Sequence, residues 1–245
     1  MYEKSAVVIP TYNEKDCIET LLATVRTKYP ALRIVVVDDN SPDGTGNMVD
    51  SLARRFGGIT LISRPKKRGI ASAYTAAFTE ILKSRSIEYL LTMDADFSHN
   101  PDDIPRLLAA LEKGNDLAIG SRYVKNGRTE NWGLWRRVLS ICGNLYARII
   151  AGVPMKDLTT GFVAYRRRII EHILAKGIRH QGYVCQVEMK FLAHKIGAKL
   201  AEVPIIFRER ERGTSKMSGA IIAEGIAAPW RLRFRRQFGG ARVVQ

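Results

Sequence analysis

Residues 1–120 of this chain alternate between short apolar runs and longer segments with helical spacing. Residues 5–10 and 33–37 are rich in valine and isoleucine, as strands buried in parallel sheets are. Between these runs, residues 15–28 place Ile18, Leu21 and Val25 on one face of a helix. The alternation continues through strands predicted at residues 60–63, 87–93 and 116–120 and helices predicted at residues 46–55, 70–83 and 102–113. This order predicts the α/β class, with a doubly wound, mostly parallel sheet and flanking helices.

The second half of the chain departs from this alternation. Residues 132–153 are predicted to form an amphipathic helix that faces a membrane. Beyond it we predict a helix at residues 184–196 and a strand at residues 201–207. No repeat or linker interrupts the chain before residue 205, so residues 1–220 are predicted to form a single domain. A basic amphipathic tail at residues 221–245 is expected to follow it.

The positive charge of the chain is concentrated in three places. The net charge is +15 over 245 residues, with clusters at residues 64–68, at residues 122–148 and in the tail. The last two clusters interleave arginines with Trp132, Trp135 and Trp230, a composition typical of segments that lie in the interface of an anionic membrane. A solvated basic face and, less favoured, nucleic-acid binding are the alternatives.

The sequence does not predict a membrane-spanning or secreted protein. No stretch reaches the roughly 18 uninterrupted apolar residues that a spanning helix needs, and the first residues lack a signal-peptide pattern. Cys17, Cys142 and Cys185 have no paired spacing, so we expect reduced thiols and neither a disulfide nor a zinc site. We therefore expect a cytoplasmic protein that binds peripherally to the cytoplasmic face of a membrane.

Acidic residues follow the predicted strands at the edge where open α/β sheets bind ligands. Asp94 and Asp96 come directly after residues 87–93, and Asp39 follows residues 33–37. Two carboxylates one residue apart offer the oxygen ligands that suit Mg²⁺ and Mn²⁺, cations that neutralise diphosphates. Neither the Gly-x-Gly-x-x-Gly motif after the first strand nor a Walker A motif occurs. The pattern favours an enzyme that uses a nucleotide sugar; a loop with two solvated acids is the alternative.

Collinear motifs across residues 5–220 add a family resemblance. They are VVIPTYNE, VVVDDNSPDGTG, RPKKRGIASAY, MDADFSH, AIGSRY, NWGLWRR, DLTTGF, GYVCQVEM and RERERGTSKMS. The chain resembles glycosyltransferase family 2 and, within it, the dolichol- and polyprenol-phosphate mannose synthases. The resemblance implies the nucleotide-diphospho-sugar transferase fold, of the GT-A type.

The resemblance implies a donor site for GDP-mannose. Asp94 and Asp96 match metal-binding acids for Mg²⁺ or Mn²⁺, and Ser98 stands where some relatives have a third ligand, a glutamine. His99 is expected to support this turn rather than to bind the metal. Residues 66–71 (KKRGIA) replace a glycine-rich stretch of the family, which removes backbone freedom and adds positive charge near the donor. The positions that match contacts to the nucleotide sugar are Pro10, Tyr12, Glu14, Val37, Asp39, Asp94, Ala95, Asp96, Arg122, Arg210 and Lys216.

The resemblance also implies an acceptor site for a polyprenyl (dolichyl-type) phosphate. Arg122, Arg136 and Ser140 match the positions that hold the acceptor phosphate. The guanidinium group suits this task because it presents parallel N–H donors to phosphate oxygens. Asp157 is expected to orient the sugar or its own loop and not to act as a base.

The implied reaction is a direct, inverting displacement at the anomeric carbon of mannose, which gives a polyprenyl β-D-mannosyl phosphate. A phosphate oxygen is already an anion at neutral pH, so no strong general base is needed. Asp96, Arg122 and Lys216 match the catalytic positions, and Arg210 and Lys216 match residues that close over the diphosphate. The alternatives are transfer of glucose from UDP-glucose to the same kind of lipid, and a non-enzymatic module that binds anionic membranes or nucleic acid. The expected partners are the donor, the lipid phosphate and a membrane surface, with a small membrane-anchoring subunit left open and no nucleic acid.

Overall fold

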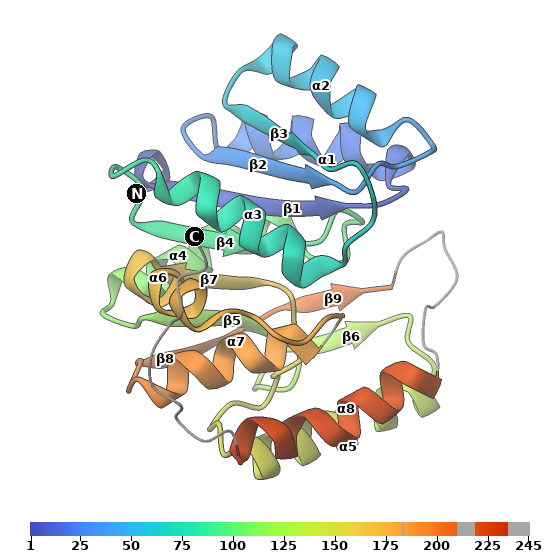
Figure 1. The fold of residues 1–245 in the computed structure, drawn as a ribbon, viewed down its shortest axis with the longest axis vertical. Helices are drawn as coiled ribbons and strands as arrows, with labels where there is room; N and C mark the ends of the chain where they lie inside the picture. Colours follow the sequence, from blue (N-terminus) through green and yellow to red (C-terminus); the bar gives the residue numbers. More distant parts are fainter. Residues whose placement is uncertain (183, 210–218, 235–245) are drawn as a thin grey trace, which may run out of the picture.

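A seven-stranded sheet lies at the centre of the structure, a computed structural model that describes residues 1–182, 184–209 and 219–234 (Figure 1). The strand order is β3-β2-β1-β4-β7-β5-β8, and neighbouring strands are parallel except where β7 is involved. The strands are β1 (Ser5–Thr11), β2 (Arg33–Asp38), β3 (Ile59–Ser63), β4 (Tyr89–Thr92), β5 (Leu117–Ser121), β7 (Val163–Arg166) and β8 (Leu200–Pro204). The predicted α/β class and the mostly parallel sheet are confirmed.

Helices cover both faces of this sheet because alternate residues of a strand point to opposite faces. In β1, Ala6 and Val8 belong to one hydrophobic core, whereas Val7 and Ile9 belong to the other. The first core is covered by α3 (Ile70–Leu82), α6 (Arg167–Lys176) and α7 (Val184–Lys195), and the second by α1 (Lys15–Lys28), α2 (Thr45–Phe56) and α4 (Ile104–Glu112). Because the helices cover both faces, the loops that connect strands and helices lie at the two ends of the strands.

The order of the strands reverses between β1 and β4. From β1 the chain moves outward through β2 to β3, and it then returns to the other side of β1 to form β4. The connections after β1 and β4 consequently diverge at the carboxyl ends of these strands. Such a switch point is where open α/β sheets bind their ligands.

The antiparallel strand β7 brings a distant part of the chain to the same edge. β7 pairs with both β4 and β5, and it runs against them. Its amino end therefore lies beside the carboxyl ends of its neighbours. The loop at residues 156–162, which leads into β7, is placed at the edge where the connections after β4 and β5 begin.

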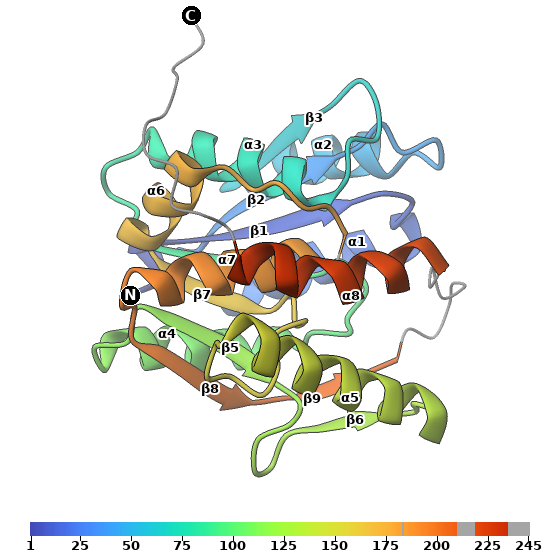
Figure 2. The same ribbon diagram turned by 60° about the horizontal axis from the view of Figure 1, so that its bottom comes forward.

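A small second sheet and two long helices extend this edge. The sheet pairs β6 (Arg128–Glu130) with β9 (Ile206–Arg208) in parallel. Helix α5 (Leu134–Ala151) follows β6, begins after Gly133 and ends at Gly152, whose left-handed φ of 68° terminates it. Figure 2 shows α8 (Gly219–Arg233) lying alongside α5, and the two helices are in contact. The helix predicted at residues 132–153 is confirmed with slightly shorter bounds.

Two sequence predictions need correction. The single strand predicted at residues 201–207 is wrong, because the chain breaks at the buried Ile205 and divides into β8 of the main sheet and β9 of the small sheet. The helix predicted at residues 102–113 begins as a 3₁₀ turn, η2 (Pro101–Asp103), which the Asn100 side chain caps through the amide of Asp102; the α-helical part starts at Ile104. β6 and α6 had no counterpart among the predicted elements.

Among the described residues, no helix is both long enough and apolar enough to cross a bilayer.

Candidate functional site

The connection after β2 is anchored by a buried ion pair. Asp39 lies just beyond β2, and its carboxylate accepts hydrogen bonds from the Arg64 side chain and, at 3.2 Å, from the backbone amide of Arg68. Arg64 in turn donates to the Ser72 hydroxyl (2.7 Å) and to the Gly69 carbonyl (3.2 Å). The pair thus fixes the basic loop at residues 64–69 next to the end of β2. The role of Asp39 toward a ribose stays a prediction.

That basic loop reaches the residues that follow β1. The Lys67 ammonium lies 3.7 Å from the centroid of the Tyr12 ring, within cation–π distance. Pro10 and Tyr12 are half-buried. Val37 is different, because its side chain is fully buried within β2 and only its backbone is available to a ligand at this edge. Contacts of these residues with a nucleoside stay predictions.

The acidic triplet after β4 forms a tight turn. Asp96 is 8% exposed, and its Oδ1 accepts hydrogen bonds from the Ser98 amide (3.1 Å) and the Ser98 hydroxyl (2.6 Å). Phe97, between them, has a left-handed φ of 58°, which is uncommon for a bulky residue. The Asp94 side chain is more open, at 31% exposure, and the buried Ala95 separates the two acids. The Ser98 hydroxyl is thus engaged with Asp96.

The buried side chain of His99 supports this turn from the interior of the domain. Its ring is fully buried and stacks on Phe162 at 5.0 Å between centroids, with the edge of Phe207 at 5.5 Å. Nδ1 lies 3.1 Å from the Asp94 amide and accepts its proton, so the ring is neutral with its own proton on Nε2. Burial lowers the pKa of His99, against the opposing effect of Asp94, which agrees with a neutral ring. The expected supporting role fits this geometry.

The donor set at this turn suits a cation that is shared with a substrate. Asp94 and Asp96 supply carboxylate oxygens, and no third acidic, histidine or cysteine side chain joins them into a metal-binding group within the described parts of the chain. Mg²⁺ is commonly held by one or two carboxylates and completes its shell with water and substrate phosphates. The residues present therefore fit a cation that binds together with a diphosphate.

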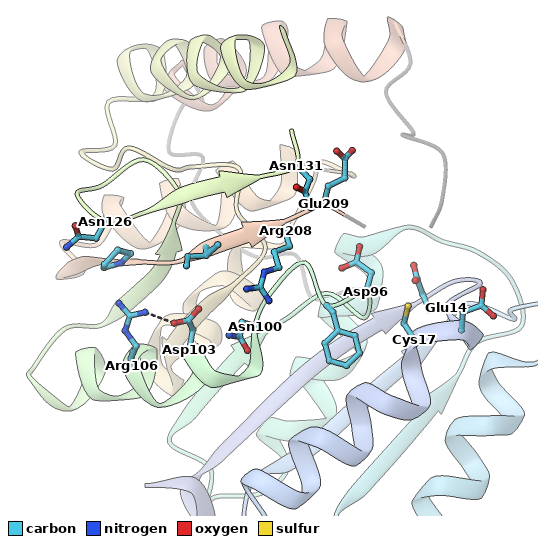
Figure 3. A pocket seen from close by; sticks show the side chains of 14 residues that line it. Glu14, Cys17, Asp96, Asn100, Asp103, Arg106, Asn126, Asn131, Arg208 and Glu209 are labelled. Carbon is cyan, nitrogen blue, oxygen red and sulfur yellow. Dashed lines mark hydrogen bonds and ion pairs between the residues drawn. The ribbon is translucent and has the colours of Figure 1, made fainter. Parts of the chain in front are cut away.

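A cavity of about 710 Å³ opens beside Asp96 (Figure 3). Asp96 and Glu14 lie at one end of it, whereas Asn126 and the pair formed by Asp103 and Arg106 lie at the other. The remaining lining residues are Asp16, Cys17, Phe97, Asn100, Asn131, Pro204, Ile206, Arg208 and Glu209. This volume is typical of a small-molecule site, and its lining joins the connection after β4 to the small sheet.

Arg122 lies directly after β5, and the loop that leads into β7 holds its side chain by hydrogen bonds. Nε and Nη2 of Arg122 donate to the two carboxylate oxygens of Asp157 at 2.7 and 2.6 Å, and Nη2 also donates to the Thr159 hydroxyl at 2.8 Å. Burial by itself would lower the pKa of Arg122, but the charge and hydrogen bonds of Asp157 raise it above its ordinary value. Nη1 has no hydrogen-bond partner among the described residues, and its protons remain for an anion.

Aromatic rings surround this guanidinium group. The centroids of Tyr123, Trp132 and Phe207 lie 5.2–5.5 Å from its central carbon. Arg136 packs on the same Trp132 ring at 4.3 Å and also pairs with Glu209. The electron-rich faces stabilise the charge and keep the surroundings of Arg122 low in dielectric.

The predicted acceptor residues are connected to one another through these rings. Arg136 and Ser140 lie on α5, and the Tyr123 hydroxyl donates to the Ser140 hydroxyl at 2.6 Å. Arg122 contacts Tyr123 and Trp132, and Arg136 contacts Trp132. The structure therefore gathers Arg122, Arg136 and Ser140 at the start of α5. Arg210 and Lys216 lie outside the described residues.

Sequence reasoning missed several residues of this cluster. Thr159 accepts a hydrogen bond from Arg122, and Tyr123 donates one to Ser140. The loop at residues 156–161 is held by Asn144 and Lys190. Asn144 is the one polar residue among the buried residues of α5, and Lys190 is one of three on α7, with Gln186 and Glu188. That pattern is a usable signal, because a polar side chain is buried only where it has partners.

Comparisons with known proteins agree with this arrangement. The family described as "Glycosyl transferase family 2" matches residues 6–174. The chain is 42% identical to polyprenol monophosphomannose synthase of Mycolicibacterium smegmatis, over 95% of this chain and 89% of that protein. It is also 42% identical to undecaprenyl-phosphate mannosyltransferase of Micrococcus luteus, over 91% and 94%. Identity to dolichol-phosphate mannosyltransferase of Pyrococcus furiosus is 36%, over 94% of this chain and 63% of that protein.

Solved structures show the same fold at low sequence identity. Glucosyl-3-phosphoglycerate synthase from Mycobacterium tuberculosis, in complex with Mn²⁺, UDP and phosphoglyceric acid, has a TM-score of 0.69 and 17% identity. The match covers 94% of this chain and 78% of that chain. The same synthase with Mn²⁺, UDP-glucose and phosphoglyceric acid gives a TM-score of 0.69 and 18% identity, over 94% and 79%.

Proposed function

The chain belongs to glycosyltransferase family 2, and on that premise we propose that it transfers mannose from GDP-mannose to a polyprenyl phosphate. The product would be a polyprenyl β-D-mannosyl phosphate, formed with inversion at the anomeric carbon. Relatives at 42% identity are named for mannose transfer to polyprenyl phosphates, which supports this choice of sugar and acceptor. The observation that carries the proposal is Arg122, whose Nη1 is left for an anion beside the acidic turn and at the start of α5.

On the donor side, the acidic turn would bind the diphosphate through a divalent cation. Asp94 and Asp96 would hold Mg²⁺ or Mn²⁺, and the named structural neighbours were crystallised with Mn²⁺. When bound, such a cation stabilises the negative charge that develops on the leaving diphosphate. Tyr12 and the pair of Asp39 with Arg64 would bind the nucleoside, and the basic loop would add positive charge. Arg210 and Lys216 would close over the diphosphate.

On the acceptor side, the phosphate would lie between Arg122, Arg136 and Ser140. Its oxygen is an anion at neutral pH and attacks the anomeric carbon without a strong base. Asp157 is unsuited to be that base, because it is fully buried and both its oxygens are engaged by Arg122. Arg122 instead neutralises the incoming phosphate and orients it by hydrogen bonds.

The lipid part of the acceptor would lie along α5, on a membrane surface. The exposed apolar residues of α5 include Leu134 and Trp135, at 78% and 73% exposure. α8 adds Trp230 and the adjoining turn adds Phe234, while the arginines interleaved with these side chains are Arg136, Arg137, Arg148, Arg231 and Arg233. This combination suits anionic head groups and the interface beneath them. Ala228 and Leu232 of α8 are buried, and α8 contacts α5. The described part of the predicted tail would therefore form, together with α5, one docking layer that consists of α5 and α8.

The function is tested with purified protein, Mg²⁺ or Mn²⁺, a short polyprenyl phosphate and either radiolabelled GDP-mannose or radiolabelled UDP-glucose. We expect label from GDP-mannose in the organic phase, lost with EDTA and with Asp96→Ala. Transfer from UDP-glucose alone would replace the proposed sugar and keep the acceptor. No transfer from either donor would reject the proposed acceptor.

The membrane contact is tested separately by co-sedimentation with vesicles that contain phosphatidylglycerol. The double variant Leu134→Ser/Trp135→Ser should bind these vesicles at least about tenfold more weakly, because two apolar side chains no longer enter the interface. Phe56→Ser is the matched control, since Phe56 is an exposed aromatic residue on α2, outside the docking layer. Equal binding by the double variant and the wild type would reject α5 as the docking helix.

A further inference from the structure

The loop at residues 156–161 is held by hydrogen bonds from side chains instead of by regular secondary structure. Glu202 of β8 accepts hydrogen bonds from the amides of Lys156 (2.9 Å) and Asp157 (3.3 Å). Lys190 of α7 donates to the Thr160 carbonyl at 2.8 Å, and Thr92 of β4 donates to the Gly161 carbonyl at 2.6 Å. Satisfying a loop's backbone in this way fixes its position, because each bond broken in a buried site leaves an unpaired polar group.

Asn144 provides the contact between this loop and α5. Its Oδ1 accepts hydrogen bonds from the amides of Leu158 (2.8 Å) and Thr159 (3.1 Å). Its Nδ2 donates to the Ser140 carbonyl (2.9 Å) and to the Thr159 hydroxyl (3.1 Å). Asn144 is 2% exposed, and these bonds use the full capacity of its amide group.

The Thr159 hydroxyl joins Asn144 to the arginine. It accepts one proton from Asn144 Nδ2 and one from Arg122 Nη2. The same loop supplies Asp157, the other partner of that guanidinium group. A displacement of the loop relative to α5 would therefore turn Arg122 away from its present direction.

We propose that Asn144 is a positioning residue that fixes the Arg122 guanidinium group relative to Ser140 and so aligns the acceptor phosphate for transfer. The inference rests on the proposed function, because it takes Arg122 and Ser140 as ligands of that phosphate. It explains why an amide stands on the buried face of a helix whose other face is apolar and exposed. The helix that would contact the membrane is thereby linked, through the side chains of Asn144 and Thr159, to the arginine that would bind the lipid phosphate.

If Asn144 only packs α5 against the domain, its substitution should affect the two substrates differently than if it positions Arg122. A packing role would lower stability and impair both substrates to a similar extent. A positioning role impairs use of the acceptor more than binding of the donor, since the Asn144 contacts lie on α5 and on the loop that leads into β7. The test must therefore measure the two substrates separately.

The experiment uses Asn144→Leu, Asn144→Asp and Thr159→Val in the full chain. We expect Asn144→Leu to lower kcat/KM for the polyprenyl phosphate on the order of 10–100-fold, as misplacing a binding group by about 1 Å does. The Kd for GDP-mannose should stay within about twofold of the wild type. Asn144→Asp retains the two accepted hydrogen bonds, so its kcat/KM should fall less. Thr159→Val removes only the shared hydroxyl and should lower kcat/KM as Asn144→Leu does. It serves as the test variant if Asn144→Leu fails to fold. Gly143→Ala is the control on the same helix, because nothing lies within 4 Å of the added carbon.

Combining the variants with Arg122→Lys separates positioning from packing. If Asn144 acts through Arg122, then Asn144→Leu should cost no more than about twofold in the Arg122→Lys background, since coupled residues are not additive. An equal loss in both backgrounds, or an equal loss for donor and acceptor, would overturn the inference while the proposed function stands. Failure of the wild type to use any polyprenyl phosphate would reject the proposed function, and the inference with it.

Discussion

The donor half and the acceptor half of this site are built in different ways. In the donor half, Asp39 and Asp94 lie within two residues of the ends of β2 and β4, and the chain needs only to form these strands to place them. In the acceptor half, Arg122 is positioned by Asp157, which is 35 residues away in the chain. Asp94 in the first half is partly open to solvent, whereas the Arg122–Asp157 pair in the second half is buried and depends on the whole sheet.

This difference has a consequence for stability. The Asp94 side chain is 31% exposed, and its carboxylate lies 3.7 Å from the His99 ring. Arg122 and Asp157 form a buried pair, so removing one partner leaves the charge of the other uncompensated. Substitution of the partly exposed Asp94 should therefore impair activity alone, whereas substitution within the buried Arg122–Asp157 pair should impair activity and folding together.

The largest expected effect is the loss of transfer in Asp94→Asn. We expect kcat to fall by roughly 10²–10³-fold, because the variant lacks a carboxylate that would hold the divalent cation on the leaving diphosphate. The free energy of unfolding, measured in urea, should change by less than about 0.5 kcal/mol. Asp102→Asn, at an exposed acid a few residues further along, is the control and should keep its activity. A large loss of stability in Asp94→Asn would contradict the distinction between the two halves.

Asp157→Asn should have the largest effect on stability. We expect the free energy of unfolding to fall by about 3 kcal/mol, because Arg122 would stay buried without its counter-charge. Urea unfolding monitored by circular dichroism measures this change. The control is Glu88→Gln, which removes an exposed ion pair with Lys4 and should leave the stability close to that of the wild type. Similar values for the two variants would show that the buried pair does not hold the acceptor half together.

A smaller effect should appear in the pH dependence of stability. Burial lowers the pKa of Lys190 to about 7, against the opposing effect of Asp157, whereas an unfolded lysine has its ordinary value of 10.5. Between these values the unfolded chain binds more protons, so the stability of the wild type relative to Lys190→Met should rise with pH, by roughly 1 kcal/mol per pH unit. Urea unfolding at pH 7.5–9.5 measures this difference. Lys113→Met removes a surface lysine and is the control; a difference that stays constant with pH for Lys190→Met would contradict the prediction.

The smallest expected effect is in the basic loop of the donor half. Lys67→Ala should raise the KM for the nucleotide sugar by about two- to fivefold, since exposed cation–π and charge interactions are worth about 0.5–1 kcal/mol. The difference should shrink as salt is added, because exposed charges are screened. Steady-state kinetics at two salt concentrations measure it. A lower KM in the variant would show instead that Lys67 competes with the donor for the Tyr12 ring.

Particular residues show where sequence-based prediction succeeded and where it failed. The acids after β2 and β4 were predicted from the strands alone, because residues at a strand end must lie at the sheet edge. The pairing of Asp39 with Arg64 was not predicted, because it depends on where β3 ends relative to β2. The break at Ile205 was also missed, because one apolar run continues through β8 and β9 and only packing in the core separates them.

Local periodicity and short motifs are enough to predict the α/β class, the acidic edge and the helix α5. They do not predict that Asp157 and Thr159 hold Arg122 or that Asn144 holds their loop, which becomes visible in the folded chain. These contacts exist because β7 enters the sheet antiparallel to its neighbours and delivers its preceding loop to the edge where β5 ends. Strand direction within a sheet depends on contacts across the whole domain, which no local pattern of residues records.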